Sequence, residues 1–273
     1  MPELPEVEVV RRGLHLTVAG RTLRAMRVRE RRLRWPIPAG VEDRVAGRRL
    51  AGIERRGKYL VLDFGTGALI VHLGMSGTLR FLAHPEPPRL HDHVDLEFEH
   101  GLLRYHDPRR FGAMLWHPQV DGAPSGHPLL AGLGIEPFDP RFDGAWLHRG
   151  FAGTRVAIKQ VLLAGQVVVG VGNIYASEAL FRAGIRPQTA ARRISPARCD
   201  RLAQAIRETL AQAIERGGSS LRDFVSSQGE QGYFQLEALV YGRDGQPCRR
   251  CGEPVRLLRQ QQRATYWCAR CQH

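Results

Sequence analysis

The sequence lacks several features, and each absence narrows what the chain can be. No apolar run approaches the ~18 residues that a membrane-spanning helix needs. No signal peptide precedes the acidic N-terminus, so we expect a cytoplasmic protein. Four of the five cysteines lie between positions 248 and 271, and nothing suggests a disulfide framework. The fifth, Cys199, is expected to be an ordinary semi-buried residue.

Lysine is also scarce. Lys58 and Lys159 are the only lysines among 40 lysine and arginine residues. A genome-wide preference for arginine codons is the simplest cause, and two surviving lysines can also arise by chance. Under such a preference, however, a retained lysine can mark a place that needs a compact, titratable ammonium group.

The chain has an excess of positively charged side chains. The formal net charge is +13 and the sequence pI is about 10.5. Such a balance favours a polyanionic partner, above all nucleic acid, although an anionic membrane surface would also attract it. The 273 residues are comfortable for two domains.

The first half of the chain predicts a leading helix followed by strands. Apolar residues recur at helical spacing from Leu4 to Val18, and Gly20 follows as a stop. Residues 59–64 and 68–73 flank a Gly-Thr-Gly turn and predict a hairpin. Many short strands between about 21 and 120 predict an antiparallel sandwich or flattened barrel.

The second half predicts helices. Residues 121–144 are rich in proline and glycine and are expected to connect two domains. Helices are expected over 155–163 and 174–183, with a long one from Ser195-Pro196 to Gly217-Gly218. The following polar stretch, 219–234, is expected to be a mobile loop.

The first residues carry a possible nucleophile. Removal of Met1 would leave Pro2 with a free secondary amine, and α-amino groups have a pKa of roughly 7.7–8.0. A usable fraction is then neutral near pH 7, and Glu3 beside it can donate or accept a proton. The simpler interpretation is a proline-containing first helical turn with acidic residues at its positive end.

A four-cysteine pattern predicts a metal site. Cys248 and Cys251 form one C-x2-C pair, and Cys268 and Cys271 form a second pair, with sixteen residues between the two pairs. Matching spacing favours a closed, structural zinc site over free thiols or redox pairs. Arginines lie between the pairs, so the hairpin tip is basic, as in nucleic-acid-binding zinc hairpins.

Three glycine-containing strings complete the pattern. Residues 169–178 (VGVGNIYASE) join two helices, where Asn173 would be an N-cap or part of a phosphate-binding corner. Residues 73–77 (LGMSG) and 107–112 (DPRRFG) occur at strand ends. Met75 and Phe111 can be core residues, or apolar wedges that fill the gap left by an extracted base.

Together with the opening PELPEVE and Arg11-Arg12-Gly13, these strings resemble the formamidopyrimidine-DNA glycosylases over essentially the whole chain. The resemblance implies an α+β fold with two domains. Its parts are an N-terminal antiparallel β-sandwich with a leading helix (1–133), a linker (134–150), a helical helix-two-turns-helix domain (151–237) and a zinc β-hairpin (238–273). The lesion-covering loop would lie at 217–233.

The resemblance also implies a reaction, which is excision of oxidised purines from double-stranded DNA by a monomeric glycosylase and abasic-site lyase, with one structural zinc ion. The implied catalytic residues are Pro2, Glu3, Lys58 and Arg263. The implied DNA-binding residues are Met75, His91, Arg109, Phe111, Arg155, Lys159, Asn173 and Tyr241. The implied zinc ligands are Cys248, Cys251, Cys268 and Cys271.

Two alternatives remain open. The first is an endonuclease VIII-like enzyme that prefers oxidised pyrimidines, against which the strings at 73–77 and 107–112 weigh. The second is a non-catalytic zinc-ribbon DNA-binding protein, which would have no need for Pro2 and Glu3 together.

Overall fold

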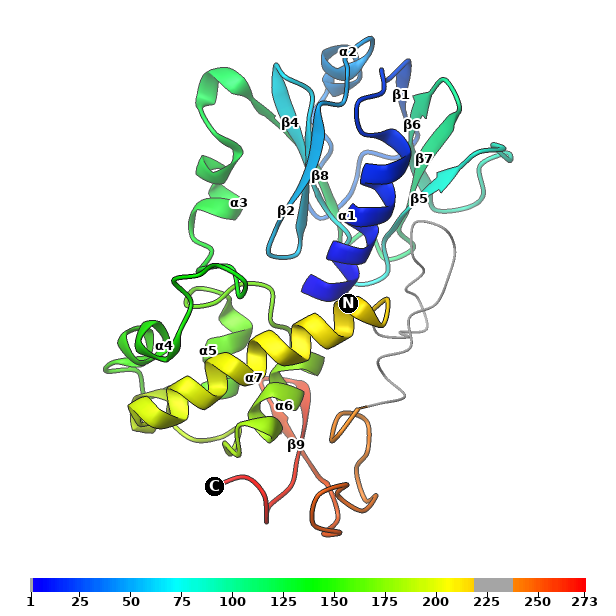
Figure 1. Cartoon of the computed structure of the whole chain (residues 1–273). Coiled ribbons are helices and arrows are strands. Elements are labelled where there is room, and N and C mark those ends of the chain that lie inside the picture. Colours follow the sequence, from blue (N-terminus) through cyan, green and yellow to red (C-terminus); the bar gives the residue numbers. More distant parts are fainter. Residues whose placement is uncertain (1, 219–237) are drawn as a thin grey trace. The chain divides into compact units, whose positions relative to one another are not determined.

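The computed structural model describes residues 2–218 and 238–273 (Figure 1). These residues divide into two compact units, one of 2–131 with 216–218, the other of 132–215 with 238–273. Apart from its first two residues, the predicted loop at 217–233 lies outside the described part of the chain. No helix in that part is long and apolar enough to cross a membrane.

The first unit is built on two antiparallel sheets, as predicted. One sheet has the order β1-β6-β7-β5 and the other the order β2-β3-β4-β8. Their strands are β1 (Ala25–Val28), β2 (Gly52–Arg56), β3 (Tyr59–Asp63), β4 (Gly67–His72), β5 (Thr78–Leu82), β6 (Asp92–Phe98), β7 (Gly101–His106) and β8 (Ala113–Pro118). The predicted hairpin is β3–β4, in which Tyr59 pairs with His72.

Helix α1 (Leu4–Val18) packs against β2, β3 and β5, and one core cluster joins it to both sheets (Figure 1). Its apolar face, predicted from the helical spacing, is fully buried, and a short α2 (Val41–Val45) adds to the same cluster. Burial of this stripe fixes the rotation of α1, and therefore fixes where its first residues are held.

The second unit is helical. It contains α4 (Gly144–Phe151), α5 (Ile158–Ala164), α6 (Asn173–Arg182) and α7 (Pro196–Glu215), while the short α3 (Pro128–Ala131) closes the first unit. The predicted linker at 134–150 therefore contains most of α4, whose N-cap Asp143 accepts the Trp146 N–H at 2.7 Å. Helix α5 begins three residues later than predicted, because the chain before it pairs with another segment.

The predicted zinc hairpin consists of β9 (Arg256–Gln260) and β10 (Arg263–Trp267). Gln261 and Gln262 connect the strands with φ of 45° and 65°, the left-handed pair that a two-residue type I′ turn requires. Arg263 follows this turn directly, so the turn fixes where β10 begins.

Candidate functional site

The N-terminus of α1 holds the predicted nucleophile region. Pro2 is buried and Glu3, the N-cap residue, is 2% exposed. The Glu3 N–H donates to the Glu6 carboxylate at 2.7 Å, in the reciprocal pattern called a capping box. The start of α1 is thus an ordered, enclosed position at the positive end of a helix.

An ionic cluster around the buried Glu8 fastens α1 to β2. The Glu8 carboxylate accepts hydrogen bonds from Arg11 and Arg12, both at 2.9 Å, and from Arg55 of β2 at 3.1 Å. Burial by itself would raise the pKa of Glu8, but the hydrogen bonds from Arg11 and Arg12 and the charges of Arg11 and Arg55 lower it to about 2. The carboxylate stays ionised, so the helix keeps this anchor at neutral pH.

Lys58 lies in the tight turn between β2 and β3, after Gly57, whose φ is 58°. The charge of Lys58 acts on His72, whose ring faces that of Tyr59 across β3–β4 with centroids 4.7 Å apart. Burial, followed by the charges of Lys58 and Arg34, lowers the pKa of His72 to about 4. The neutral ring accepts the Gly74 N–H at 3.0 Å through Nδ1 and so shapes the loop that contains Met75.

The two predicted wedge residues are exposed, as a stack-filling role requires. Met75 is 39% and Phe111 43% exposed, and the Arg109 guanidinium lies 4.7 Å from the centroid of the Phe111 ring. Their two loops pack backbone to backbone. A Cβ added at Gly74, whose φ is 67°, would lie 2.5 Å from the Phe111 carbonyl carbon. A side chain at position 74 would therefore push the loops apart.

Asp107, the first residue of the 107–112 string, joins these loops, a role that the sequence analysis did not predict. This fully buried carboxylate accepts the Ser76 hydroxyl at 2.9 Å, the Tyr105 hydroxyl at 3.2 Å and the Gly112 N–H at 2.9 Å. Its position ahead of Pro-Arg-Arg, at the end of a strand, is the only sequence signal that marks it.

The backbone of Asp107 also reaches His91. The Asp107 N–H donates to the His91 carbonyl at 3.1 Å, and the Asp107 carbonyl accepts from Nε2 of His93 at 2.8 Å. His91 itself has φ of 73°, and its ring stands edge-on to those of His93 and His106 at 6.1 Å. The structure therefore brings together His91 and both wedge loops in the first unit.

The four C-terminal cysteines fit a zinc ion. Their sulfur atoms all lie within 4.8 Å of one another, with 3.9 Å between Cys248 and Cys271 and 3.5 Å between Cys251 and Cys268. Tetrahedral zinc with Zn–S bonds of about 2.3 Å separates its sulfurs by about 3.8 Å. These contacts are too long for disulfides, and the Arg250 N–H already points at the Cys248 sulfur. The set would hold one structural ion with no open position.

Lys159, Asn173 and Tyr241 meet behind the hairpin. The carbonyl oxygen of Ala264, next to Arg263, accepts from Lys159 Nζ at 3.0 Å and from Asn173 Nδ2 at 3.1 Å. Asn173 Nδ2 also donates to the Tyr241 hydroxyl at 3.4 Å. These contacts bind the start of β10 to α5 and α6.

One of these positions differs from the prediction, and a second is enclosed within the protein. Gly172 is the N-cap of α6, and Asn173 is its first helical residue, with its side chain turned to the hairpin. Lys159 is fully buried and also donates to Thr265 Oγ1 at 2.8 Å, so its ammonium group does not reach solvent. A direct DNA contact by Lys159 stays a prediction. Arg155, by contrast, is exposed.

Family models agree with this architecture. Residues 1–114 match the model described as the formamidopyrimidine-DNA glycosylase N-terminal domain, and residues 133–225 match that family's H2TH domain. Residues 245–273 match a zinc finger found in FPG and IleRS. The chain belongs to the formamidopyrimidine-DNA glycosylase family.

Relatives and solved structures of this family match the full length. A formamidopyrimidine-DNA glycosylase of Bordetella pertussis is 64% identical over 273 residues, covering 100% of this chain and 99% of that protein. The MutM (Fpg) protein of Thermus thermophilus superposes with a TM-score of 0.89 at 39% identity, over 99% of this chain and 98% of that one. A Lactococcus lactis Fpg variant in complex with Fapy-dG-containing DNA gives 0.91 at 33% identity, over 99% of each chain.

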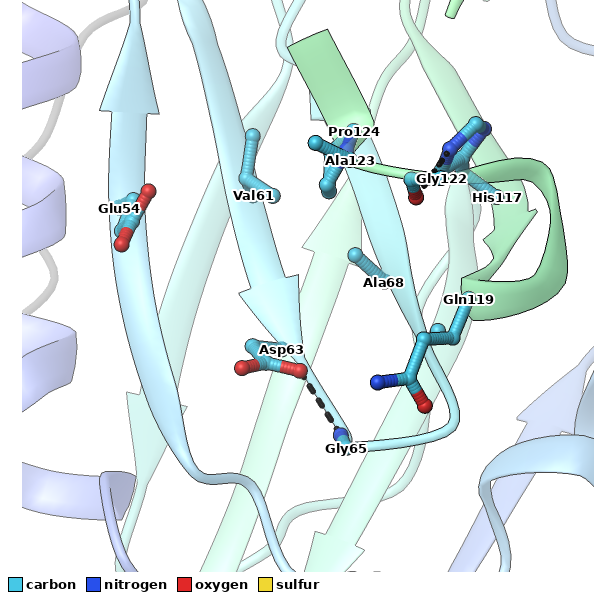
Figure 2. Close-up of a pocket in the computed structure, with 11 residues that line it drawn as sticks. Glu54, Val61, Asp63, Gly65, Ala68, His117, Gln119, Gly122, Ala123 and Pro124 are labelled. Carbon is cyan, nitrogen blue, oxygen red and sulfur yellow. Dashed lines mark hydrogen bonds between the residues drawn. The ribbon is translucent and has the colours of Figure 1, made fainter. Parts of the chain in front are cut away.

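A separate pocket of about 530 Å³ contains none of the residues that the family resemblance singled out. It lies over β2, β3, β4 and β8, where Glu54, Asp63 and His117 line it (Figure 2). Asp63 accepts the Gly65 N–H at 2.8 Å, and His117 Nε2 donates to the Gly122 carbonyl at 3.1 Å. Both contacts stabilise local turns, and no ligand chemistry follows from them.

Proposed function

We propose that this chain excises oxidised purines, such as 8-oxoguanine and formamidopyrimidines, from double-stranded DNA and then cleaves the abasic site, in base-excision repair. The observation that carries the proposal is the enclosed Pro2-Glu3 pair at the N-terminus of α1, in a chain that matches this family throughout. Solved Lactococcus lactis relatives bound to Fapy-dG DNA and to abasic-site DNA support the substrate class.

In the proposed reaction, the Pro2 nitrogen attacks C1′ of the damaged nucleotide once Met1 has been removed. The glycosidic bond breaks and its electron pair leaves with the base. The departing base takes up the proton that the amine nitrogen loses. Glu3 in its acid form protonates the sugar ring oxygen, so the ring opens to an iminium ion on Pro2. Burial and the positive end of α1 both disfavour a protonated amine before this attack.

The remaining roles follow the family resemblance. Loss of a C2′ proton expels the 3′ phosphate, and a second elimination expels the 5′ phosphate, which leaves a one-nucleotide gap with phosphorylated ends. Lys58 would assist lesion recognition and proton transfer, while Arg263 would contact the phosphate at the lesion. Met75, Arg109 and Phe111 would fill the vacated stack, and His91, Asn173 and Tyr241 would face phosphates.

The chain would act as a monomer in the cytoplasm, on chromosomal DNA. Zinc would supply no chemistry at the sugar. Its four thiolate ligands would hold the hairpin that presents Arg263.

Borohydride trapping tests the proposal. Wild-type protein should cross-link to duplexes containing 8-oxoguanine, because borohydride reduces the iminium ion between the protein and the sugar to a stable C–N bond. Pro2→Gly should lose most of this adduct. Glu3→Gln should bind the lesion but fail to excise it, whereas Glu208→Gln, on the exposed face of α7, is the charge-matched control.

Three outcomes would contradict parts of this scheme. Retention of Met1 on active enzyme, seen by mass spectrometry, would exclude Pro2 as the nucleophile. Faster excision of thymine glycol than of 8-oxoguanine would favour the endonuclease VIII-like activity. Lesion binding without any trapped adduct would favour the non-catalytic DNA-binding protein.

A further inference from the structure

Four arginines gather in one pocket of the second unit. Arg155, Arg186, Arg192 and Arg193 line a space of about 450 Å³, together with Gln188, Thr189 and Ala190. All four arginines are exposed, and no acidic residue takes part in the lining. The lining thus carries four cationic side chains and no anionic one.

Paired backbone, and not a loose loop, holds these side chains together. Residues 154–158 run beside residues 189–192, with an antiparallel bridge between Ala157 and Ala190. The Arg192 N–H donates to the Thr154 carbonyl at 3.0 Å, and the N–H groups on either side of the bridge make similar contacts. Arg155 is therefore fixed next to Arg192 and Arg193, although nearly forty positions separate them in the sequence.

The charges of this cluster are not balanced within the described chain, where none of the four arginines forms an ion pair with a carboxylate. Other arginines do so, such as Arg141 with Asp139 at 2.8 Å in the same unit. Arg186 instead lies over the Trp267 ring at 4.9 Å and donates to Gln188 at 3.2 Å. Neighbouring guanidinium groups repel one another, and a bound anion would relieve that repulsion.

The basic surface continues from the pocket to the zinc hairpin. Arg256 of β9 also lies over Trp267, at 5.9 Å, so this ring of β10 is shared with Arg186. The Pro187 carbonyl accepts the backbone N–H of Lys159 at 3.4 Å, which places the pocket segment against the base of α5. The pocket is thus continuous with the elements that hold Arg263.

We propose that this pocket binds backbone phosphates of the DNA duplex beyond the lesion, so that Arg186, Arg192 and Arg193 add a second electrostatic contact beside Arg155, which the family resemblance already implies in DNA binding. Guanidinium forks match phosphate oxygens bidentately, and contacts of this kind position a protein on DNA without reading sequence. Free polyphosphate would offer the same phosphate groups to the arginines. Because the pocket is continuous with the zinc hairpin, we infer that the bound phosphates come from the DNA duplex. The proposal rests on the proposed function in so far as the protein binds DNA.

Salt-dependent binding tests the proposal in the full-length protein. The double variant Arg192→Gln/Arg193→Gln removes two charges from the pocket. The double variant Arg149→Gln/Arg201→Gln removes two exposed charges from α4 and α7 of the same unit as a matched control. Dissociation constants are measured against salt concentration on duplexes with a tetrahydrofuran lesion analogue, extending about 5 or about 15 base pairs to each side, so that only the longer adds a full helical turn.

On the longer duplex, the log of the association constant falls as the log of the salt concentration rises. The pocket variant should make this fall shallower by about 1–2 in slope, the value for one or two lost phosphate contacts, and the control variant should not. On the shorter duplex the two variants should bind alike. Equal slopes for both variants on the longer duplex would overturn the proposal. Binding of inorganic tripolyphosphate, lost only in the pocket variant, with no change in DNA slope would assign the site to free polyphosphate and also overturn it.

Borohydride trapping of the wild type on the shorter duplex reports the proposed function independently. Its failure would leave the binding result interpretable, and an unchanged salt slope would leave the lyase chemistry intact.

Discussion

The Asp107 carboxylate accepts the hydroxyl of Ser76 at 2.9 Å, and through this bond it links the two loops that expose Met75 and Phe111. Ser76 directly follows Met75, and Asp107 begins the segment that leads to Phe111. A single buried acid therefore sets the spacing between the two apolar side chains. The proposed wedge role would need such a tie, because neither loop is part of a strand where it is exposed.

Replacement of Asp107 tests this tie. Asp107→Ala removes the carboxylate that three buried donors share and should cost about 2–4 kcal/mol of stability, together with most of the excision rate. Asp107→Asn should be much milder, since the Ser76 hydroxyl can turn and accept from the new amide. Urea unfolding and single-turnover excision measure the two effects. If Asp107→Ala loses stability but excises at the wild-type rate, Asp107 does not position the wedge.

Exposure of Phe111 separates a wedge from a core residue. Phe111→Ala should lower stability by less than about 1 kcal/mol, since the ring is 43% exposed, yet it should slow excision from duplex DNA strongly. Phe98→Ala is the matched control, because that ring is 4% exposed and its loss should cost about 3–5 kcal/mol. A thermal melt and a single-turnover excision assay on each variant distinguish the two roles. A melting loss for Phe111→Ala as large as that of the control would make Phe111 a core residue.

Local pattern predicted most of the fold. The spacing of apolar residues in α1 and the glycine turn between β3 and β4 are short-range signals, and the structure confirms both elements. The four cysteines carry their own spacing, and their sulfurs do converge. In each case the residues that decide the structure lie close together in the sequence.

Tertiary contacts explain what the pattern did not predict. Lys159 is buried because it bonds to Thr265, 106 positions away, and Asn173, the only asparagine, turns to Ala264, 91 positions away. Asp107 has near neighbours at Tyr105 and Gly112 but meets Ser76 across 31 positions. No periodicity reveals which carboxylate or ammonium will be enclosed by such contacts.

Zinc content tests the four-cysteine site. Wild-type protein should contain about one zinc ion per chain, and Cys248→Ser should lose it, because four thiolates complete the tetrahedral set. DNA binding should weaken with the metal, since Arg263 lies on the hairpin. Cys199→Ala is the control. This cysteine is fully buried, which raises the pKa of its thiol to about 11, so it makes a poor thiolate ligand. Elemental analysis that finds full zinc in Cys248→Ser would refute the assigned ligand set.

His72 should make stability depend on pH in a defined window. Its folded pKa is about 4 and its ordinary value is 6.5, so between these values the unfolded chain binds a proton that the folded chain does not. The contribution of His72 to the free energy of unfolding is therefore complete above about pH 6.5 and is lost as the pH falls towards 4, by up to about 3 kcal/mol.

His72→Asn keeps an acceptor for the Gly74 N–H but cannot titrate. Between pH 7.5 and 5, urea unfolding should show the wild type losing about 2 kcal/mol more than this variant. The exposed-site variant His148→Asn should follow the wild type. Equal pH dependence of wild type and His72→Asn would show that the ring takes up its proton over the same pH range in the folded and the unfolded chain. The bond from the Gly74 N–H to this ring would then not hold the Met75 loop.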